Sequence, residues 1–170
     1  MKNDILKIYL DCDGVIADFD IRAIETFGHR FDEFPTSKDA WEAMKAYQHF
    51  YRDLPKMPDA DELVNGVYTL AAQHGYSVGV LTALPRMQAF PFCEEDKKLW
   101  LNDHWPQLLH DFNIGPYAVD KQKWAKPGQV LIDDRPMNIE QWRSKGGYGI
   151  LHVSAKQSLG QLRKYLKGGI

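Results

Sequence analysis

Short hydrophobic runs alternate with amphipathic segments along most of the 170-residue chain. The runs are rich in β-branched and aromatic residues, as buried strands are. They span Ile5–Leu10, Tyr76–Leu81, Tyr117–Val119, Val130–Ile132 and Tyr148–Val153. Helical periodicity predicts helices over Asp59–Gln73, Glu94–Trp105, Asn138–Lys145 and Ser158–Lys167. This alternation predicts an α/β, Rossmann-like fold in which helices cover a parallel sheet.

One segment does not fit the alternation, because it is too long and too aromatic for a simple connection between a strand and a helix. It follows the first predicted strand and contains Trp41, Tyr47, Phe50 and Tyr51. We predict that residues 19–58 form a small helical cap, inserted into an α/β core that comprises residues 1–18 and 59–170.

Composition narrows the class of protein further. Hydrophobic residues make up 44% of the chain and charged residues 26%, which is typical of soluble globular proteins. With a net charge of −2, the chain has no excess of positive charge to bind a phosphate backbone, so we expect no stable nucleic-acid complex. Two cysteines without a pattern, no cleavable signal and no long apolar run favour a cytoplasmic protein without a membrane partner. The oligomeric state is not indicated.

Acidic residues follow two of the predicted strands. Asp11 and Asp13 come directly after the first strand, and Asp133 and Asp134 follow the Val130–Ile132 run. Either pair alone is compatible with an ordinary polar turn. Since the carboxyl ends of parallel strands meet at one edge of a sheet, however, we expect both pairs to lie together there. Clustered carboxylates are suited to a hard cation such as Mg²⁺.

Groups that suit a phosphate follow the other strands. Thr82 and Ala83 come after the Tyr76–Leu81 run and offer a hydroxyl and backbone amides. Lys121, Lys123 and Lys126 precede the Val130–Ile132 run, where a lysine can neutralise a phosphoryl group. Each of these groups alone is common. Along the chain, however, the first acidic pair, the threonine, the lysines and the second acidic pair all lie at or beside predicted strand ends.

This ordered set resembles the four motifs of the haloacid-dehalogenase-like superfamily. Three longer strings resemble the 5′(3′)-deoxyribonucleotidases within it. They are DCDGVIADF at 11–19, FYRDLPKMPDADE at 50–62 and VLIDDRP at 130–136. The resemblance spans roughly residues 5 to 152 and implies the Rossmann-like core with a cap after its first strand.

The resemblance also implies roles for the acidic residues. Asp11 would be the nucleophile that forms an aspartyl-phosphate, and Asp13 would protonate the leaving group and later activate water. Asp11, Asp133 and the backbone carbonyl of Asp13 would bind Mg²⁺. Asp134 would support these ligands from a second layer.

The remaining expected site residues bind the substrate. The resemblance selects Thr82, the amide of Ala83 and Lys123 for the phosphate, with Lys126 as the other candidate lysine. The deoxyribonucleotidases usually have Ser at the position of Ala83, so one hydroxyl donor is missing here. Phe19 would lie against the base, and Arg86 would lie near the phosphate.

Three other aromatic residues of the cap leave two interpretations open. They are Trp41, Phe50 and Tyr51. They form either a second wall around the base or the small hydrophobic core of the cap.

The predicted function is therefore Mg²⁺-dependent hydrolysis of a small phosphomonoester, with deoxyribonucleoside monophosphates as the expected substrates. A phosphosugar or a polynucleotide end is the alternative substrate. A dehalogenase is disfavoured, because carbon–halogen cleavage does not need the acid that Asp13 supplies. A catalytically silent phosphate-binding module is also disfavoured, because crowded carboxylates cost stability without a cation.

Overall fold

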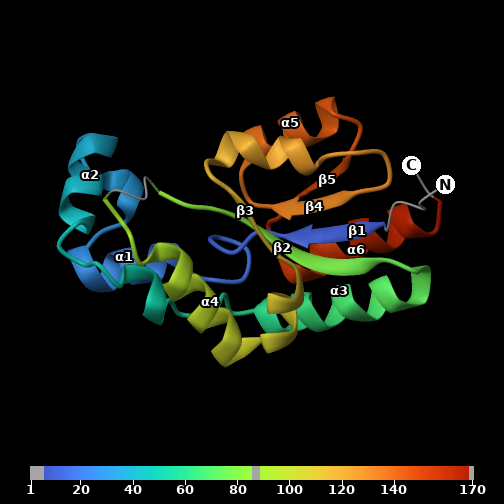
Figure 1. Cartoon of the computed structure of the whole chain (residues 1–170), viewed down its shortest axis with the longest axis horizontal. Helices are drawn as coiled ribbons and strands as arrows, with labels where there is room; N and C mark the ends of the chain where they lie inside the picture. The colour runs from blue at the N-terminus through green and yellow to red at the C-terminus, as the bar shows by residue number, and fades with distance from the viewer. Residues whose placement is uncertain (1–5, 86–88, 169–170) are drawn as a thin grey trace.

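A five-stranded parallel sheet forms the centre of the molecule (Figure 1). The computed structural model describes residues 6–85 and 89–168. In the order β3-β2-β1-β4-β5, the strands are Phe112–Gly115, Ser77–Ala83, Lys7–Leu10, Val130–Asp133 and Tyr148–Leu151. The predicted α/β, Rossmann-like class is confirmed. All five carboxyl ends point towards the same edge of the sheet.

Helices cover both faces of this sheet (Figure 1). α3 (Ala60–His74) and α6 (Ala155–Leu166) lie side by side on one face, and α5 (Pro136–Ser144) covers the other. The alternation of side chains in β1 divides the core accordingly. Ile8 and Leu10 belong to the larger hydrophobic cluster, whereas Tyr9 packs edge-on against Trp142 of α5 with ring centroids 5.7 Å apart.

One predicted strand was wrong. Tyr117–Val119 does not enter the sheet, because Ala118–Trp124 forms the 3₁₀ helix η4, and Phe112–Gly115 forms β3 instead. β3 is an edge strand and is only partly buried, so it carries no continuous apolar run. The side chain of Asn113 even donates to the carbonyl of Val80 at 3.2 Å, a contact that no hydrophobic pattern can indicate.

The segment between β1 and α3 is helical, as predicted, and lies at the carboxyl edge of the sheet (Figure 1). It contains α1 (Phe19–Phe27), η1 (Phe31–Glu33), α2 (Ser37–Met44) and η2 (Phe50–Asp53). Its two ends run side by side. Asp18 N donates to Pro55 O at 2.7 Å, and Met57 N donates to Ile16 O at 3.0 Å. The boundaries at residues 18 and 58 stay a prediction.

α4 (Cys93–His104) connects this cap to the sheet, and the 3₁₀ helix η3 (Pro106–Asp111) follows it. The indole Nε1 of Trp100 donates to Leu54 O at 2.7 Å, and His49 Nδ1 lies 2.9 Å from Asp96 Oδ1. A helix that follows β2 therefore holds the exit of the cap in place.

Candidate active site

The site begins where the chain leaves β1. Asp11 still donates its backbone N–H to Ile132 O of β4 at 3.0 Å, and its buried carboxylate accepts from Cys12 N at 2.8 Å. The turn then closes with Gly14 at a φ of +76°, a conformation that glycine adopts without strain. β1 and this turn together fix the direction of the Asp11 side chain.

Asp133 occupies the equivalent end of the neighbouring strand β4. Its carboxylate is fully buried and accepts from Arg135 N at 2.9 Å. The side-chain amide of Asn138 on α5 lies 3.0 Å from both carboxylate oxygens. These bonds hold Asp133 rigidly at the edge of the sheet.

The two strand ends bring three carboxylates together. One oxygen each of Asp11, Asp133 and Asp134 lies within 4.8 Å of the others. Burial, followed by the charges of Asp11 and Asp133, raises the pKa of Asp134 to about 7. Burial, followed by the charge of Asp11, also raises the pKa of Asp133. Crowded oxygen ligands whose ionisation is unfavourable fit a hard divalent cation.

Asp134, which we expected to support the ligands from a second layer, has a carboxylate oxygen within 4.8 Å of one oxygen each of Asp11 and Asp133. The reason is the turn at Gly14. A Cβ atom at Gly14 would stand 2.2 Å from Asp134 Oδ2, so only a glycine lets this carboxylate approach. The Asp133-Asp134 sequence thus contributes both of its side chains to the same cluster.

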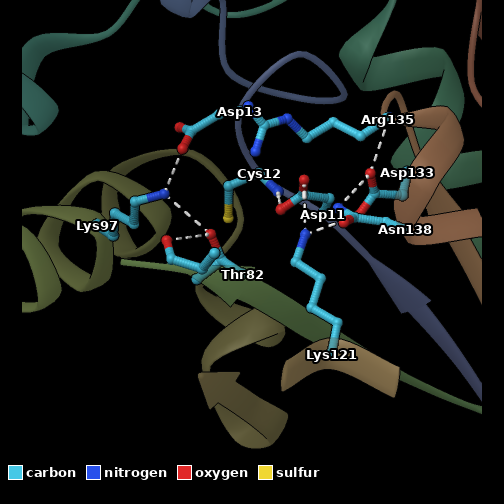
Figure 2. A network of polar contacts seen from close by, with 10 residues as sticks. Asp11, Cys12, Asp13, Thr82, Lys97, Lys121, Asp133, Arg135 and Asn138 are labelled. Atoms are coloured by element: carbon cyan, nitrogen blue, oxygen red, sulfur yellow. Dashed lines mark hydrogen bonds and ion pairs between the residues drawn. The ribbon is translucent and has the colours of Figure 1, made fainter. Parts of the chain in front are cut away.

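A buried lysine neutralises part of this negative charge. Lys121 Nζ lies 2.8 Å from Asp11 Oδ2 and 2.7 Å from Asp133 Oδ2, and its side chain is 2% exposed (Figure 2). Burial lowers the pKa of Lys121, but the two carboxylates more than offset this effect and leave the pKa above its usual value. The site therefore contains a permanent ammonium group beside Asp11.

Lys123, the lysine that we predicted for this position, does not reach the site. Its side chain is 70% exposed and pairs with Asp120 at 2.6 Å. Both lysines belong to η4, and with three residues per turn a 3₁₀ helix points residues two apart in different directions. Lys126, the other candidate, is exposed in the loop after η4.

A second buried lysine was not predicted at all. Lys97 of α4 donates to Asp13 Oδ2 at 2.6 Å and to Thr82 Oγ1 at 2.9 Å (Figure 2). Burial lowers its pKa, but Asp13, the largest opposing cause, contributes to a net rise above the usual value. A lysine on a helix between two strands looks like a solvated residue in the sequence, so no local signal distinguishes it.

Lys97 bridges Thr82 and Asp13, because its ammonium donates to both side chains. Thr82 is fully buried in β2, and Ala83 ends that strand. The Asp13 carboxylate lies with Lys97, apart from the acidic cluster, and the side chain of Arg135 extends towards it (Figure 2).

The cap residues that we predicted to contact a substrate have different surroundings. Phe19 is partly buried among other aromatic rings, with its ring centroid 5.3 Å from Phe31 and 6.0 Å from Tyr51. Phe50 and Tyr51 are buried, which favours the cap-core interpretation for them, whereas Trp41 is half-buried. Arg86 lies outside the described residues.

Comparison with known proteins connects this site to a family. Residues 3–159 match the family model described as 5′ nucleotidase, deoxy (pyrimidine), cytosolic type C. A Bordetella bronchiseptica protein with the provisional name 5′(3′)-deoxyribonucleotidase is 30% identical over 150 residues, which cover 78% of this chain and 75% of that protein. The mouse protein named 5′(3′)-deoxyribonucleotidase, mitochondrial, is 24% identical over 153 residues, which cover 77% and 65% of the two chains.

A solved structure shares the fold. A hydrolase from Streptococcus pneumoniae superposes with a TM-score of 0.51 at 12% identity, and the match covers 96% of this chain and 98% of that one.

Proposed function

The chain belongs to the family of deoxy (pyrimidine) 5′-nucleotidases of cytosolic type C, and from this premise we propose that it hydrolyses deoxyribonucleoside monophosphates through an aspartyl-phosphate on Asp11. One observation carries the proposal. The Asp11 carboxylate lies at the end of a buried strand, inside an acidic cluster and 2.8 Å from the ammonium of Lys121. Phosphoryl transfer needs a nucleophilic carboxylate, a group of carboxylates that can bind a cation, and a fixed positive charge.

Mg²⁺ is the proposed cofactor. Asp11, Asp133 and the backbone carbonyl of Asp13 would hold the ion, and the carboxylate of Asp134 is close enough to assist directly or through water. When bound, Mg²⁺ supplies positive charge that keeps Asp11 ionised and stabilises the phosphoryl oxygens.

The first half of the reaction uses Asp11 and Asp13. An oxygen of the Asp11 carboxylate forms a bond to phosphorus while the ester P–O bond breaks. The electron pair of that bond leaves with the substrate oxygen, which takes a proton from Asp13. The products of this half are the free alcohol and the aspartyl-phosphate.

The second half restores the enzyme. Asp13, now a carboxylate, removes a proton from a water molecule as that water attacks phosphorus. The bond between Asp11 and phosphorus breaks, its electron pair returns to the carboxylate, and inorganic phosphate is released. Asp13 has regained its proton, so the cycle is balanced.

The phosphoryl oxygens would be bound by Thr82, by the backbone amide of Ala83 and by Lys121. Lys121 takes the role that we expected for Lys123, because its ammonium lies beside the nucleophile. From there it would stabilise the negative charge that develops on the phosphoryl oxygens. The missing hydroxyl at Ala83 removes about 1 kcal/mol of binding, or somewhat more with a charged acceptor.

The cap would select the substrate. Phe19 and Trp41 are only partly buried, so both retain surface for a flat base, whereas Phe50 and Tyr51 are buried. Arg86 stays a proposed phosphate neighbour on the resemblance alone. A phosphosugar or a polynucleotide end is the alternative substrate class, and the net charge of −2 does not favour a long polyanion.

We propose the cytoplasm as the location. Both cysteines, Cys12 and Cys93, are buried and free, which suits a reducing compartment. In the described part of the chain, no helix combines the length and the apolar character needed to cross a bilayer.

The decisive experiment measures phosphate release by the purified protein with Mg²⁺ and with a chelator. The substrates are ribo- and deoxyribonucleoside 5′- and 3′-monophosphates, phosphosugars and an oligonucleotide with a terminal phosphate. Asp11→Asn should lose activity on the order of 10⁴-fold or more while it remains folded. Asp32→Asn is the matched control, since Asp32 is an exposed carboxylate of the cap that pairs with Arg30.

Each result has a defined meaning. Mg²⁺-dependent preference for deoxynucleotides supports the proposal in full. Equal activity on phosphosugars keeps the chemistry but discards the nucleotide substrate. Near-normal turnover by folded, Mg²⁺-loaded Asp11→Asn overturns the aspartyl-phosphate mechanism.

A further inference from the structure

Lys97 is an unusual residue for its position on α4. Its side chain is 3% exposed, and a buried ammonium group is costly unless charged or polar partners surround it. The partners are Asp13 Oδ2 at 2.6 Å and Thr82 Oγ1 at 2.9 Å, and the ammonium also lies 4.9 Å from the ring centroid of Tyr51. One cation therefore joins the end of β1 to the end of β2.

The two oxygens of the Asp13 carboxylate have different surroundings. Oδ2 accepts the short bond from Lys97. Oδ1 is shielded from solvent and has no hydrogen-bond partner among the described residues. An unpartnered carboxylate oxygen shielded from solvent is uncommon in proteins, and a catalytic role is one of its recognised explanations. The carboxylate thus has one anchored oxygen and one that can serve the reaction.

The position of Lys97 is itself fixed by the cap. Asp96, its neighbour on α4, contacts His49 at 2.9 Å, and Trp100 one turn later donates to Leu54 O at 2.7 Å. α4 therefore cannot rotate or slide without breaking contacts to the cap exit. Lys97 is held between this helix and the two strand ends.

We propose that Lys97 is a positioning residue for proton transfer to the leaving group. Its ammonium holds Oδ2 of Asp13, so that Oδ1 faces the substrate oxygen and delivers the proton as the P–O bond breaks. The inference rests on the proposed phosphomonoesterase chemistry and adds a residue to it. Lys97 acts through Asp13 and does not itself exchange the proton.

Substrates with different leaving groups distinguish this role from others. A nucleoside monophosphate releases an alkoxide, which must be protonated as it leaves. The nitrophenolate of p-nitrophenyl phosphate is stable without a proton. A residue that orients the acid matters for the first substrate, whereas a residue that binds phosphate or supports the fold matters for both.

The experiment compares kcat/KM for both substrates in wild type and in Lys97→Met. This parameter reports the steps up to the first irreversible one, which include P–O cleavage. We expect a loss of about 10²-fold on the nucleotide and a much smaller loss on p-nitrophenyl phosphate. Lys98→Met is the matched control. Lys98 is the next residue on α4, is exposed and pairs with Glu94, so neither value should change.

A double-mutant cycle with Asp13→Asn completes the test. If Lys97 acts through Asp13, Lys97→Met should cause no further loss on the nucleotide in the Asp13→Asn background. Lys97→Gln keeps a hydrogen-bond donor at this position and should recover part of the nucleotide activity. It also serves as the test variant if circular dichroism shows that Lys97→Met does not fold.

Two outcomes overturn the inference. One is an equal loss on both substrates in a folded variant, and the other is a full independent loss in the Asp13→Asn background. Failure of the proposed function gives a different result, namely wild-type protein that releases no phosphate from nucleotides. If wild type prefers a phosphosugar, that alkyl phosphate replaces the nucleotide and the comparison with p-nitrophenyl phosphate is unchanged.

Discussion

Lys121 Nζ lies 2.8 Å from Asp11 Oδ2, which places a buried ammonium beside the proposed nucleophile. The approach depends on close packing of η4 against β3. At Gly115 of β3, a Cβ atom would stand 3.1 Å from Lys121 N and 3.3 Å from Lys121 Cγ. A larger residue there would press on the segment that carries this lysine.

Replacement of Lys121 should therefore abolish most activity. Lys121→Met removes the charge but keeps a similar volume, and we expect kcat to fall about 10²- to 10³-fold. Lys123→Met is the control, because Lys123 is two residues away and 70% exposed. Initial rates at saturating nucleotide and Mg²⁺ measure both. Our assignment of the lysine is wrong if Lys123→Met shows the large loss.

Removal of Mg²⁺ should expose a pH dependence of stability that originates at Asp134. Burial and neighbouring charges raise its pKa to about 7 in the fold, against about 4 in the unfolded chain. The folded state then binds the extra proton, so its contribution to stability is present at low pH and is lost as the pH rises from about 4 to about 7.

Thermal unfolding with a chelator over this pH range measures the effect. The melting temperature of Asp134→Asn should change less with pH than that of wild type, because the titrating group is gone. Added Mg²⁺ should raise the melting temperature most at the alkaline end, where the carboxylates are ionised. An identical pH profile of wild type and Asp134→Asn without metal would show that Asp134 is not the source.

Adding a single methyl group at Gly14 should impair both stability and activity. Gly14→Ala places a methyl group 2.2 Å from Asp134 Oδ2 and also requires a φ near +76°. We expect a cost of about 1 kcal/mol from the backbone and a loss of activity on the order of 10²-fold from displacement of the cluster.

Gly75→Ala separates these two effects. Gly75 ends α3 with a φ of +73°, and a Cβ atom there meets nothing within 4 Å. Chemical denaturation should show the backbone cost alone for Gly75→Ala and at least that cost for Gly14→Ala, whereas only Gly14→Ala should lose activity and Mg²⁺ affinity. A Gly14→Ala enzyme with wild-type kcat would contradict the described contact.

His152 should make the fold less stable in mild acid. The side chain is buried after β5, with Nδ1 2.9 Å from Ser158 Oγ, and burial lowers its pKa below the usual value. The unfolded chain then binds the proton more readily. Stability should therefore decline as the pH falls below about 6.5.

Denaturant unfolding in saturating Mg²⁺, which keeps Asp134 ionised and removes its opposite contribution, measures this effect at several pH values between neutral and mildly acidic. His152→Gln should weaken the acid dependence, while His110→Gln, a change at an exposed histidine, should leave it intact. The opposite sign, with wild type gaining stability in acid, would show that another group dominates this range.

The parts of the site that lie at strand ends could be predicted from the sequence. Asp11, Asp133 and Thr82 follow apolar runs that do form β1, β4 and β2, and in a parallel sheet the direction of the strands alone brings such residues together. Asp134 was predicted near the site for the same reason, although its direct place in the cluster depends on the missing side chain at Gly14.

The two lysines could not be predicted in this way. Lys121 differs from Lys123 only by its rotation within a 3₁₀ helix, and this rotation depends on packing against β3. Lys97 reaches Asp13 across 84 residues of sequence, from a helix whose orientation is fixed by contacts with the cap. β3 was misplaced for a similar reason, since an edge strand needs no apolar run.

The paired ends of the inserted helices have a consequence for evolution. Because Asp18 bonds to Pro55 and Met57 bonds to Ile16, the inserted segment leaves the sheet and returns to it at nearly one point. Apart from the segment around His49 and Leu54, which contacts α4, residues between these bonds can be lengthened, shortened or exchanged at a small entropic cost, without a shift in the register of β1. Mutations that change substrate preference can thus accumulate in one stretch of the gene, while selection for chemistry acts on another.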